Sequence, residues 1–263
     1  MLRFAYQSLP SRVVFEAGGL ARLPEEVEKL GARRALVLTT PEQRPLGERV
    51  AQALGARAAG VHDKAQMHVP METAEAARAE AARLGADCCV AVGGGSTIGL
   101  GKAIALTSDL PIVAVPTTYA GSEMTPIYGL TDGGLKKTGR DLRVLPRTVI
   151  YDPELTLTLP AQLSACSGMN AMAHAVEALY AQDANPIISL MAEASIGALA
   201  VALPAVMDNP ADLEARSGAL YGAWLAGACL GSVGMALHHK LCHTLGGSFN
   251  LPHAQAHTIV LPY

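Results

Sequence analysis

The chain has 263 residues, of which 50% are hydrophobic and 16% are charged, and its formal net charge is −3. This balance favours a compact enzyme of one or two domains and excludes a largely disordered chain. Lys and Arg are scattered without a basic tract, which excludes the electrostatic surface of a nucleic-acid-binding protein.

The cysteines and the N-terminus indicate the compartment. No CxxC pair occurs, and we expect all five cysteines to be reduced: Cys88, Cys89, Cys166, Cys229 and Cys242. The N-terminal sequence MLRFAYQSLPSRVVFEAGG lacks the long apolar run of a secretory signal. Other apolar stretches are interrupted by Gly, His or Pro before the roughly 18–20 residues that a membrane span needs. We therefore expect a soluble, cytoplasmic protein with no membrane partner.

Short β-branched runs alternate with Ala-rich segments before residue 152. In chain order, the expected elements are a strand at 33–40, a helix at 46–54, a strand at 58–61, a helix at 73–84, a strand at 87–92, a helix at 96–107, a strand at 111–116, a polar hairpin within 129–149 and a strand at 147–151. Apolar strands that alternate with helices predict a Rossmann-like α/β domain, 1–152, whose parallel sheet is covered on both faces.

Ala, Leu and Met recur at helical spacing after residue 152. The expected helices span 164–181, 186–202, 213–230 and 236–246. These helices predict an all-α C-terminal domain, 153–263. Its last residues, HTIVLPY, form an apolar segment without a cap or polar tail, so we expect the helical domain to be truncated.

Three glycines, Gly93, Gly94 and Gly95, stand between a buried strand and a helix. Glycine lets the backbone turn sharply and approach a ligand closely. Ser96 is the expected N-cap, and the first N–H groups of the helix form an anion site that suits a dinucleotide pyrophosphate. The alternative is a turn that only packs the helix onto the sheet. The spacing matches neither GxGxxG nor a Walker A loop.

A second polar loop follows the strand at 111–116. Thr117, Thr118 and Ser122 lie at the carboxyl end of that strand, where open α/β sheets bind their ligands. We expect these hydroxyl groups to contact a cofactor, and the alternative is an ordinary polar turn.

Histidines gather near the C-terminus. His239 and His243 are four residues apart, as are Asn170 and His174 on an earlier helix, so each pair shares a helix face. Further histidines nearby in the sequence are His238, His253 and His257. Imidazoles suit metal binding or proton transfer near neutral pH. Any single histidine is more often a core or surface residue, but the group as a whole predicts a functional site.

Four segments in this order resemble the iron-containing alcohol dehydrogenases: GGGSTIGLGKAIAL, PTTYAGSEMTPIYGLTD, the Asn170–His174 helix and HHKLCHTLGGSFNLPHAQAH. The first of them, together with LKKTGRDLRVLPRTVIYDPELT, resembles the maleylacetate reductase branch. The resemblance covers nearly the whole chain. It implies a dinucleotide-binding domain, a helical domain and an active site in the cleft between them. Family members continue beyond the point that matches residue 263.

The resemblance assigns roles to matching positions. Gly93, Gly94, Gly95 and Ser96 match the pyrophosphate loop of the family, and Thr117 and Thr118 match its cofactor-contacting threonines. His243 matches the residue beside the nicotinamide to which proton transfer is assigned. Metal-dependent members bind their ion with an Asp and three histidines, and the matching positions here are Asn170, His174, His239 and His253.

Three positions depart from the pattern of the metal-dependent members. Asn170 replaces the Asp, and a neutral amide is a weaker ligand than a carboxylate. Gly99 stands where many of those members carry an Asp. No acidic residue follows the strand at 33–40 until Glu42, so the carboxylate that usually binds the adenine ribose is missing. We therefore expect no functional metal at the four matching positions, and we expect both NADH and NADPH to be accepted.

The resemblance implies the reduction of maleylacetate to 3-oxoadipate during the degradation of aromatic compounds. His243 or His253 would stabilise the negative charge on the ketone oxygen and protonate the enolate. A dicarboxylate substrate needs cations, for which the candidates are Lys102, Arg140, Arg143 and Lys240. Relatives are commonly dimers, so a homodimer is expected.

Three other functions stay open. A metal-dependent dehydrogenase of an alcohol or polyol would hold iron or zinc. An NAD-using lyase of the dehydroquinate synthase type shares the architecture, but its metal site needs the carboxylate that Asn170 lacks. A truncated helical domain could also leave the chain without catalytic activity.

Overall fold

A computed structural model describes residues 3–249 and 251–263. The chain forms two compact units. The sheet unit consists of Pro10–Thr117 and Pro126–Asp152. The helical unit contains Pro153–Tyr263, the segment 118–125 and the N-terminal segment up to Leu9.

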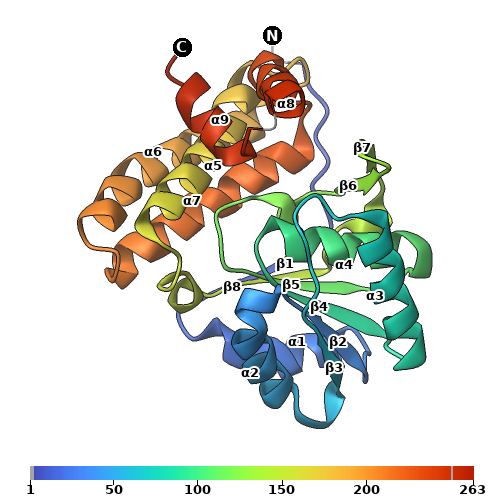
Figure 1. The fold of residues 1–263 in the computed structure, drawn as a ribbon. Coiled ribbons are helices and arrows are strands. Elements are labelled where there is room, and N and C mark those ends of the chain that lie inside the picture. Colours follow the sequence, from blue (N-terminus) through green and yellow to red (C-terminus); the bar gives the residue numbers. More distant parts are fainter. Residues whose placement is uncertain (1–2, 250) are drawn as a thin grey trace. The chain divides into compact units, whose positions relative to one another are not determined.

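The sheet unit is built on six parallel strands in the order β1-β8-β5-β4-β2-β3 (Figure 1). Their bounds are β1 Arg12–Phe15, β2 Ala35–Leu38, β3 Ala58–His62, β4 Cys88–Gly93, β5 Ile112–Pro116 and β8 Thr148–Tyr151. The helices are α1 Leu23–Lys29, α2 Arg44–Leu54, α3 Met71–Arg83 and α4 Gly95–Ser108. In Figure 1, α1 and α2 cover one face of the sheet and α3 and α4 cover the other. The parallel sheet predicted from the alternating pattern is therefore confirmed, and β1 is an additional edge strand.

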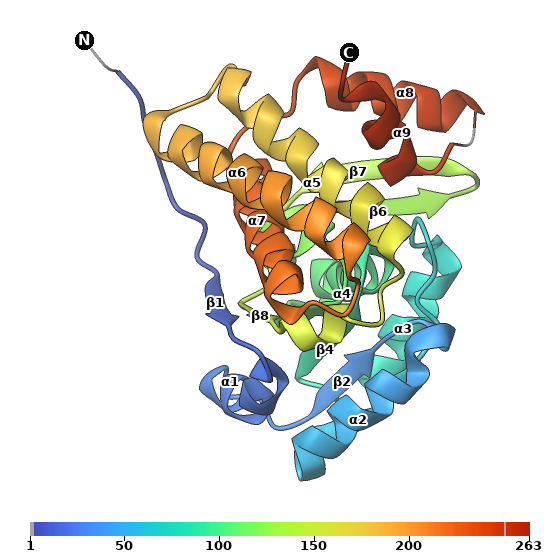
Figure 2. The same ribbon diagram turned by 90° about the vertical axis from the view of Figure 1, so that its left-hand side faces the viewer.

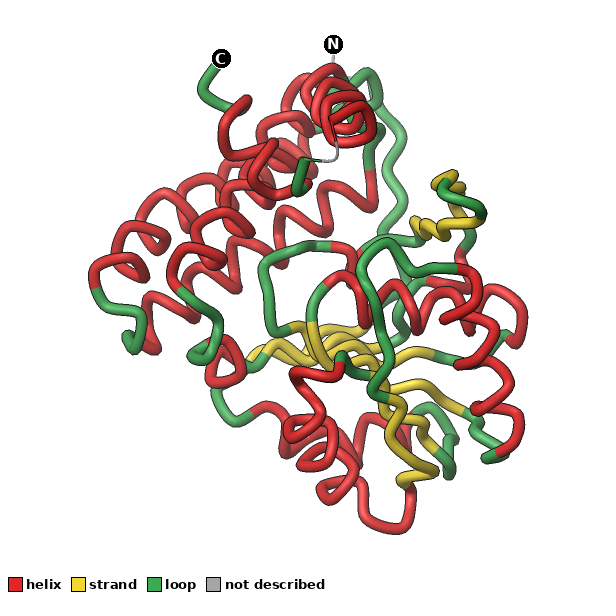
Figure 3. The backbone as a smooth tube through the Cα atoms, in the orientation of Figure 1, coloured by secondary structure: helices red, strands yellow, loops and turns green. Residues whose placement is uncertain are grey.

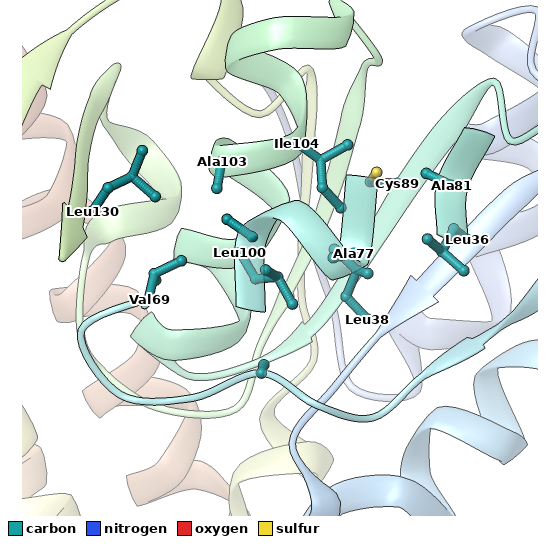
Figure 4. Close-up of a cluster of buried hydrophobic side chains, with 12 residues drawn as sticks. Leu36, Leu38, Val69, Ala77, Ala81, Cys89, Leu100, Ala103, Ile104 and Leu130 are labelled. Atoms are coloured by element: carbon teal, nitrogen blue, oxygen red, sulfur yellow. The ribbon is translucent and has the colours of Figure 1, made fainter. Parts of the chain in front are cut away.

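The core of this unit lies where α3 and α4 pack on the central strands. Figure 4 shows Leu36 and Leu38 of β2, Cys89 of β4, and Leu100 and Ile104 of α4 in one cluster, and all five side chains are fully buried. Burial of each large aliphatic side chain stabilises the fold by about 1.5–3 kcal/mol. This packing holds the strand–loop–helix segment at β4 and α4 in a fixed conformation.

The polar segment after β5 forms the expected hairpin. Strands β6 Ile127–Asp132 and β7 Leu135–Arg140 pair antiparallel in a separate two-stranded sheet (Figure 3). The turn residues Gly133 and Gly134 both have positive φ angles, 54° and 78°, which glycine adopts readily.

The helical unit consists mainly of five helices: α5 Ala161–Tyr180, α6 Pro186–Asp208, α7 Leu213–Ser232, α8 Leu237–Phe249 and α9 His253–Val260. The first three pack against one another, and α9 packs on both α5 and α8 (Figure 2). The four predicted helices are present, and α9 is a fifth that the sequence pattern did not indicate.

A buried arginine connects separate segments of the helical unit by hydrogen bonds. Arg216 on α7 is fully buried and donates hydrogen bonds to Ser164 Oγ (2.6 Å), to the Leu159 carbonyl (2.8 Å) and to the Pro210 carbonyl (2.9 Å). A buried guanidinium is tolerated only where its donors find such partners.

One described helix, α6, is long and apolar enough to cross a membrane by length and composition alone, with a mean hydropathy of 1.8. Helices α7 and α8 would form a second such segment if the pair, bent by 97°, were one span. Gly197 and Pro204 do not end α6, so the expectation that apolar stretches are too short is wrong for this helix. Core helices of water-soluble proteins pass the same test, so the finding is weak evidence.

Candidate active site

The glycine-rich loop of the sheet unit connects β4 to α4. Gly93 has a φ of +148°, and a Cβ atom at this position would lie 2.6 Å from Thr97 Oγ1 and 2.8 Å from Gln43 Oε1. Only glycine fits there without displacing its neighbours. A Cβ atom at Gly95 would meet nothing within 4 Å, so the start of the helix faces open space.

The N-cap of this helix lies two residues before the expected position. Helix α4 begins at Gly95, so Gly94 is the N-cap and Ser96 stands inside the first turn. Gly94 has no side chain to cap the helix, and its carbonyl accepts the first intrahelical bonds from Thr97 and Ile98 (3.1 Å each). The N–H groups of Gly95 and Ser96 precede those bonds and are suited to bind an anion.

Thr117 lies beside this loop in the sheet unit. Its N–H group donates to the Gly93 carbonyl (3.1 Å), and its Oγ1 accepts a hydrogen bond from Gln43 Nε2 (3.0 Å). Gln43 reaches the loop from the turn after β2, and sequence reasoning missed it. The structure therefore brings Gly93 and Thr117 together, as the sequence predicts, and adds Gln43 as the side chain that positions them.

Thr118 and Ser122 belong to the loop 118–125 of the helical unit. This loop lies against α7 at Gly121, whose φ is +80°. A Cβ atom added at Gly121 would lie 3.0 Å from the Gly227 Cα atom. The same Cβ position is 3.6 Å from His174 Nδ1. The loop thus lies against the first of the clustered histidines.

Six imidazole rings form a histidine cluster from α5, α8 and α9: His174, His238, His239, His243, His253 and His257. The ring centroids of His239 and His257 are 4.3 Å apart, and those of His253 and His257 are 4.4 Å apart. His174 stacks on His239 at 4.7 Å. The histidines singled out in the sequence, His238 and His257 among them, are therefore neighbours.

A buried carboxylate orients one ring of the cluster. Glu177 on α5 is fully buried, and its Oε2 lies 2.5 Å from His239 Nδ1. The backbone N–H groups of His239 and Ala236 donate to the same carboxylate at 3.1 and 3.2 Å. These bonds fix the ring so that Nδ1 faces the carboxylate and Nε2 faces away from it. Sequence reasoning missed Glu177, although it stands one turn after His174.

Several polar atoms of this region are buried without a hydrogen-bond partner. They are Asn170 Oδ1, His174 Nδ1, His239 Nε2 and His257 Nε2. An unpaired buried polar atom costs about 1–3 kcal/mol, so each of these atoms is available to hydrogen-bond or coordinate a bound group. Burial and the neighbouring imidazoles lower the pKa of His257 to about 2, and they lower that of His174 in the same direction. Both rings are neutral near pH 7 and present lone pairs to a ligand.

The positions that match the metal ligands of the family differ from those of the metal-dependent members at Asn170, where a neutral amide replaces the carboxylate. Within 3–249 and 251–263, one group of three or more His, Cys, Asp or Glu side chains brings its ligand atoms within 4.8 Å of one another, and that group is His238, Cys242 and His257. The histidines His174, His239 and His253 form no such group, and Asn170 contributes only a neutral amide.

The four candidate cations occupy different settings. Lys102 is buried and donates to the Ile127 carbonyl (2.7 Å), so it holds β6 on α4 and the expectation that it faces a substrate is wrong. Arg143 pairs with Asp141 (2.7 Å), and Arg140 is exposed on β7. Lys240 follows His239 on α8.

A hollow of about 630 Å³ lies beside Lys240 in the helical unit. Its lining residues are Gln182, Asp183, Gly234, Met235, Ala236, Leu237 and Lys240. Of the four candidate cations, Lys240 is thus the one that stands both next to the histidine cluster and at the rim of a hollow.

Known families match both parts of the chain. The model of the iron-containing alcohol dehydrogenases matches residues 10–153, and the model of the C-terminal region of the Fe-containing alcohol dehydrogenase family matches residues 164–263. The maleylacetate reductase of Burkholderia cepacia is 65% identical over 263 residues, which are 100% of this chain and 75% of that protein.

Two solved structures share the fold at high identity. The maleylacetate reductase from Agrobacterium tumefaciens has a TM-score of 0.96 and 56% identity over 98% of this chain and 73% of its own. An iron-containing alcohol dehydrogenase from Corynebacterium glutamicum has a TM-score of 0.96 and 50% identity over 100% of this chain and 74% of its own. The chain thus spans about three quarters of the length of these relatives.

Proposed function

The chain belongs to the iron-containing alcohol dehydrogenase family, and from this premise we propose that it reduces maleylacetate to 3-oxoadipate with NADH or NADPH in the catabolism of aromatic compounds. The observation that carries the proposal is the 65% identity along the whole chain to the maleylacetate reductase of Burkholderia cepacia. In this proposal the histidine cluster and the glycine-rich loop would supply the chemistry that this reaction needs.

The cofactor would bind through its pyrophosphate at the start of α4. The N–H groups of Gly95 and Ser96 would donate to the phosphate oxygens, and the α4 dipole would favour the negative charge. Thr117 is held next to Gly93 by its own bonds, so it would contact the cofactor without rearrangement. Thr118 and Ser122 would add hydroxyl groups.

When bound, the reduced nicotinamide supplies a hydride to the carbon–carbon double bond conjugated to the substrate ketone. The electron pair of that double bond then moves toward the ketone oxygen, where negative charge develops. The rings of His243 and His253 are exposed and 5.2 Å apart. One of them would donate a hydrogen bond to this oxygen, and one of them, in its protonated form, would transfer its proton to the α-carbon of the enolate. Glu177 would keep His239 in one orientation beside them.

A dicarboxylate substrate also needs a positive charge near the reacting atoms. Lys240 stands one residue after His239 on an exposed turn of α8, and its ammonium group would attract one carboxylate. The proposed mechanism routes no step through a metal ion, because Asn170 offers a neutral amide where metal-dependent members carry a carboxylate.

A substrate panel tests the proposal. NADH and NADPH oxidation by the whole chain should be measured with maleylacetate and with a series of simple aldehydes, each with and without a chelator. We expect turnover with maleylacetate that persists in the chelator, and little turnover with aldehydes. Turnover of aldehydes that the chelator abolishes would instead establish a metal-dependent alcohol dehydrogenase.

A further inference from the structure

A cysteine and two histidines converge at one edge of the histidine cluster. His238 and Cys242 are four residues apart on α8 and so face the same side, and His257 reaches them from α9. His238 Nε2 lies 2.9 Å from His257 Nδ1 and 3.8 Å from Cys242 Sγ. The three ligand atoms lie within 4.8 Å of one another, as the ligands of a single ion do.

The chemistry of these donors favours a thiophilic divalent ion. A thiolate and two imidazoles are the ligands that zinc prefers, whereas the family's set, with its carboxylate, suits a harder ion. Cys242 and His257 are fully buried, and His238 is half-buried. Three protein ligands would leave one position of a tetrahedral ion for water or another donor.

The competing interpretation is an imidazole–imidazole hydrogen bond with a thiol beside it. That arrangement gives Cys242 only a long contact of 3.8 Å. An ion at ~2.0–2.1 Å from each nitrogen separates the two nitrogens by ~3.4 Å. Because His238 and His257 stand on different helices, a small shift of α9 relative to α8 would supply the difference.

We propose that His238, Cys242 and His257 bind a zinc-like divalent ion that joins α9 to α8. The ion would sit one residue away along α8 from the position that the metal-dependent members of the family use. Helix α9 has only 8 residues and carries His253 at its start, so a bond between α9 and α8 would hold that histidine in place. This site does not depend on the proposed reaction.

Cobalt(II) provides the test because a cobalt–thiolate bond gives a charge-transfer band in the near ultraviolet. The full-length chain would be stripped of metal with a chelator, kept reduced with a phosphine and titrated with Co²⁺ while absorbance is recorded. We expect the band to saturate at one ion per chain. Zn²⁺ added afterwards should displace the cobalt and remove the band.

Three variants assign the ligands. Cys242→Ser should abolish the band, whereas Cys166→Ser, a half-buried cysteine on α5, should leave it unchanged. His257→Gln should weaken Co²⁺ binding by more than the ~10–100-fold that loss of a second-shell partner causes. Circular dichroism of each metal-free variant would establish that it is folded.

Three outcomes would overturn the proposal. The first is a wild-type chain without a thiolate band at saturating Co²⁺. The second is a band that persists in Cys242→Ser. The third is tight Co²⁺ binding that His174→Gln abolishes and Cys242→Ser leaves intact, because that result would place the ion at the family position.

Discussion

The two candidate sites differ in how many of their polar groups are paired within the protein. In the sheet unit, the Thr117 N–H group donates to the Gly93 carbonyl and Gln43 donates to the Thr117 hydroxyl, so the loop is held by bonds within its own unit. In the helical unit, Asn170 Oδ1 and His174 Nδ1 are among several buried atoms without a partner. At the loop one buried side-chain oxygen, Thr97 Oγ1, lacks a partner, whereas Asn170 and the histidine cluster have four such atoms.

The largest effect should come from the histidine cluster. His243→Gln removes a proton donor while keeping a side chain of similar size, so kcat for maleylacetate should fall by ~100–10,000-fold. The matched control is His68→Gln, which changes an exposed histidine of the sheet unit and should keep wild-type turnover. Steady-state kinetics measure kcat for both variants. Wild-type turnover in His243→Gln would show that His243 does not donate the proton.

The buried guanidinium of Arg216, which has hydrogen-bond partners, contrasts with the unpartnered polar atoms of the same unit. Arg216→Met leaves Ser164 and two backbone carbonyls without their donor, so the free energy of unfolding should drop by about 3–5 kcal/mol. Arg143→Met alters an exposed ion pair and should change stability little. Urea unfolding of both variants measures the difference, and equal stabilities would show that the bonds of Arg216 contribute no net stability.

The glycine-rich loop allows a paired substitution in the sheet unit. Gly93→Ala forces a Cβ atom into Thr97 and Gln43 at a positive φ, so we expect a loss of about 1–3 kcal/mol in stability and weaker NADH binding. Gly95→Ala meets open space, so its stability should be kept or slightly increased while NADH binding still weakens. Thermal unfolding and NADH fluorescence titration separate the two effects. If Gly95→Ala binds NADH with wild-type affinity, the pyrophosphate does not bind at this loop.

The smallest expected effect is on the pH dependence of stability. The unfolded chain protonates His257 near its usual pKa of 6.5, but the folded chain does so only near pH 2. The unfolded state therefore binds more protons between these values, and stability falls as the pH is lowered from 6.5. The slope contributed by this ring is at most about 1.4 kcal/mol per pH unit.

Urea unfolding between pH 7 and pH 5 in the presence of a chelator measures that slope. His257→Gln should lose stability less steeply than the wild type as the pH falls, and Gly95→Ala should keep the wild-type slope. Identical slopes in the wild type and His257→Gln would mean that His257 is not held neutral in the fold.

The sequence predicted the elements whose burial leaves a strong pattern. Continuous apolar runs predicted β4 and β5, and Ala-rich periodicity predicted α3. Strand β1 was missed because it has only four residues and pairs with β8, which follows more than a hundred residues later. Helix α9 was missed because its 8 residues span barely two turns, too few to establish a period.

Contacts between distant residues limited the prediction of the site. The glycine loop and the paired histidines could be recognised from spacing, because a helix fixes which side chains share a face. Gln43 and Glu177 could not, since their roles arise from a turn and a helix that pack beside residues 74 and 62 positions away. A lone carboxylate in an Ala-rich helix is more often exposed, so nothing local indicated that Glu177 is buried.

The chain passes from the sheet unit into the loop 118–125 and then returns to the sheet unit at Pro126. The helical unit is therefore not one continuous stretch of the gene. A fragment that starts at Pro153 would lack the backbone that Gly121 lays against Gly227, and it would expose a face of α7 whose small residues exist to admit that backbone. A single cut in the chain therefore cannot separate the two units as the structure divides them.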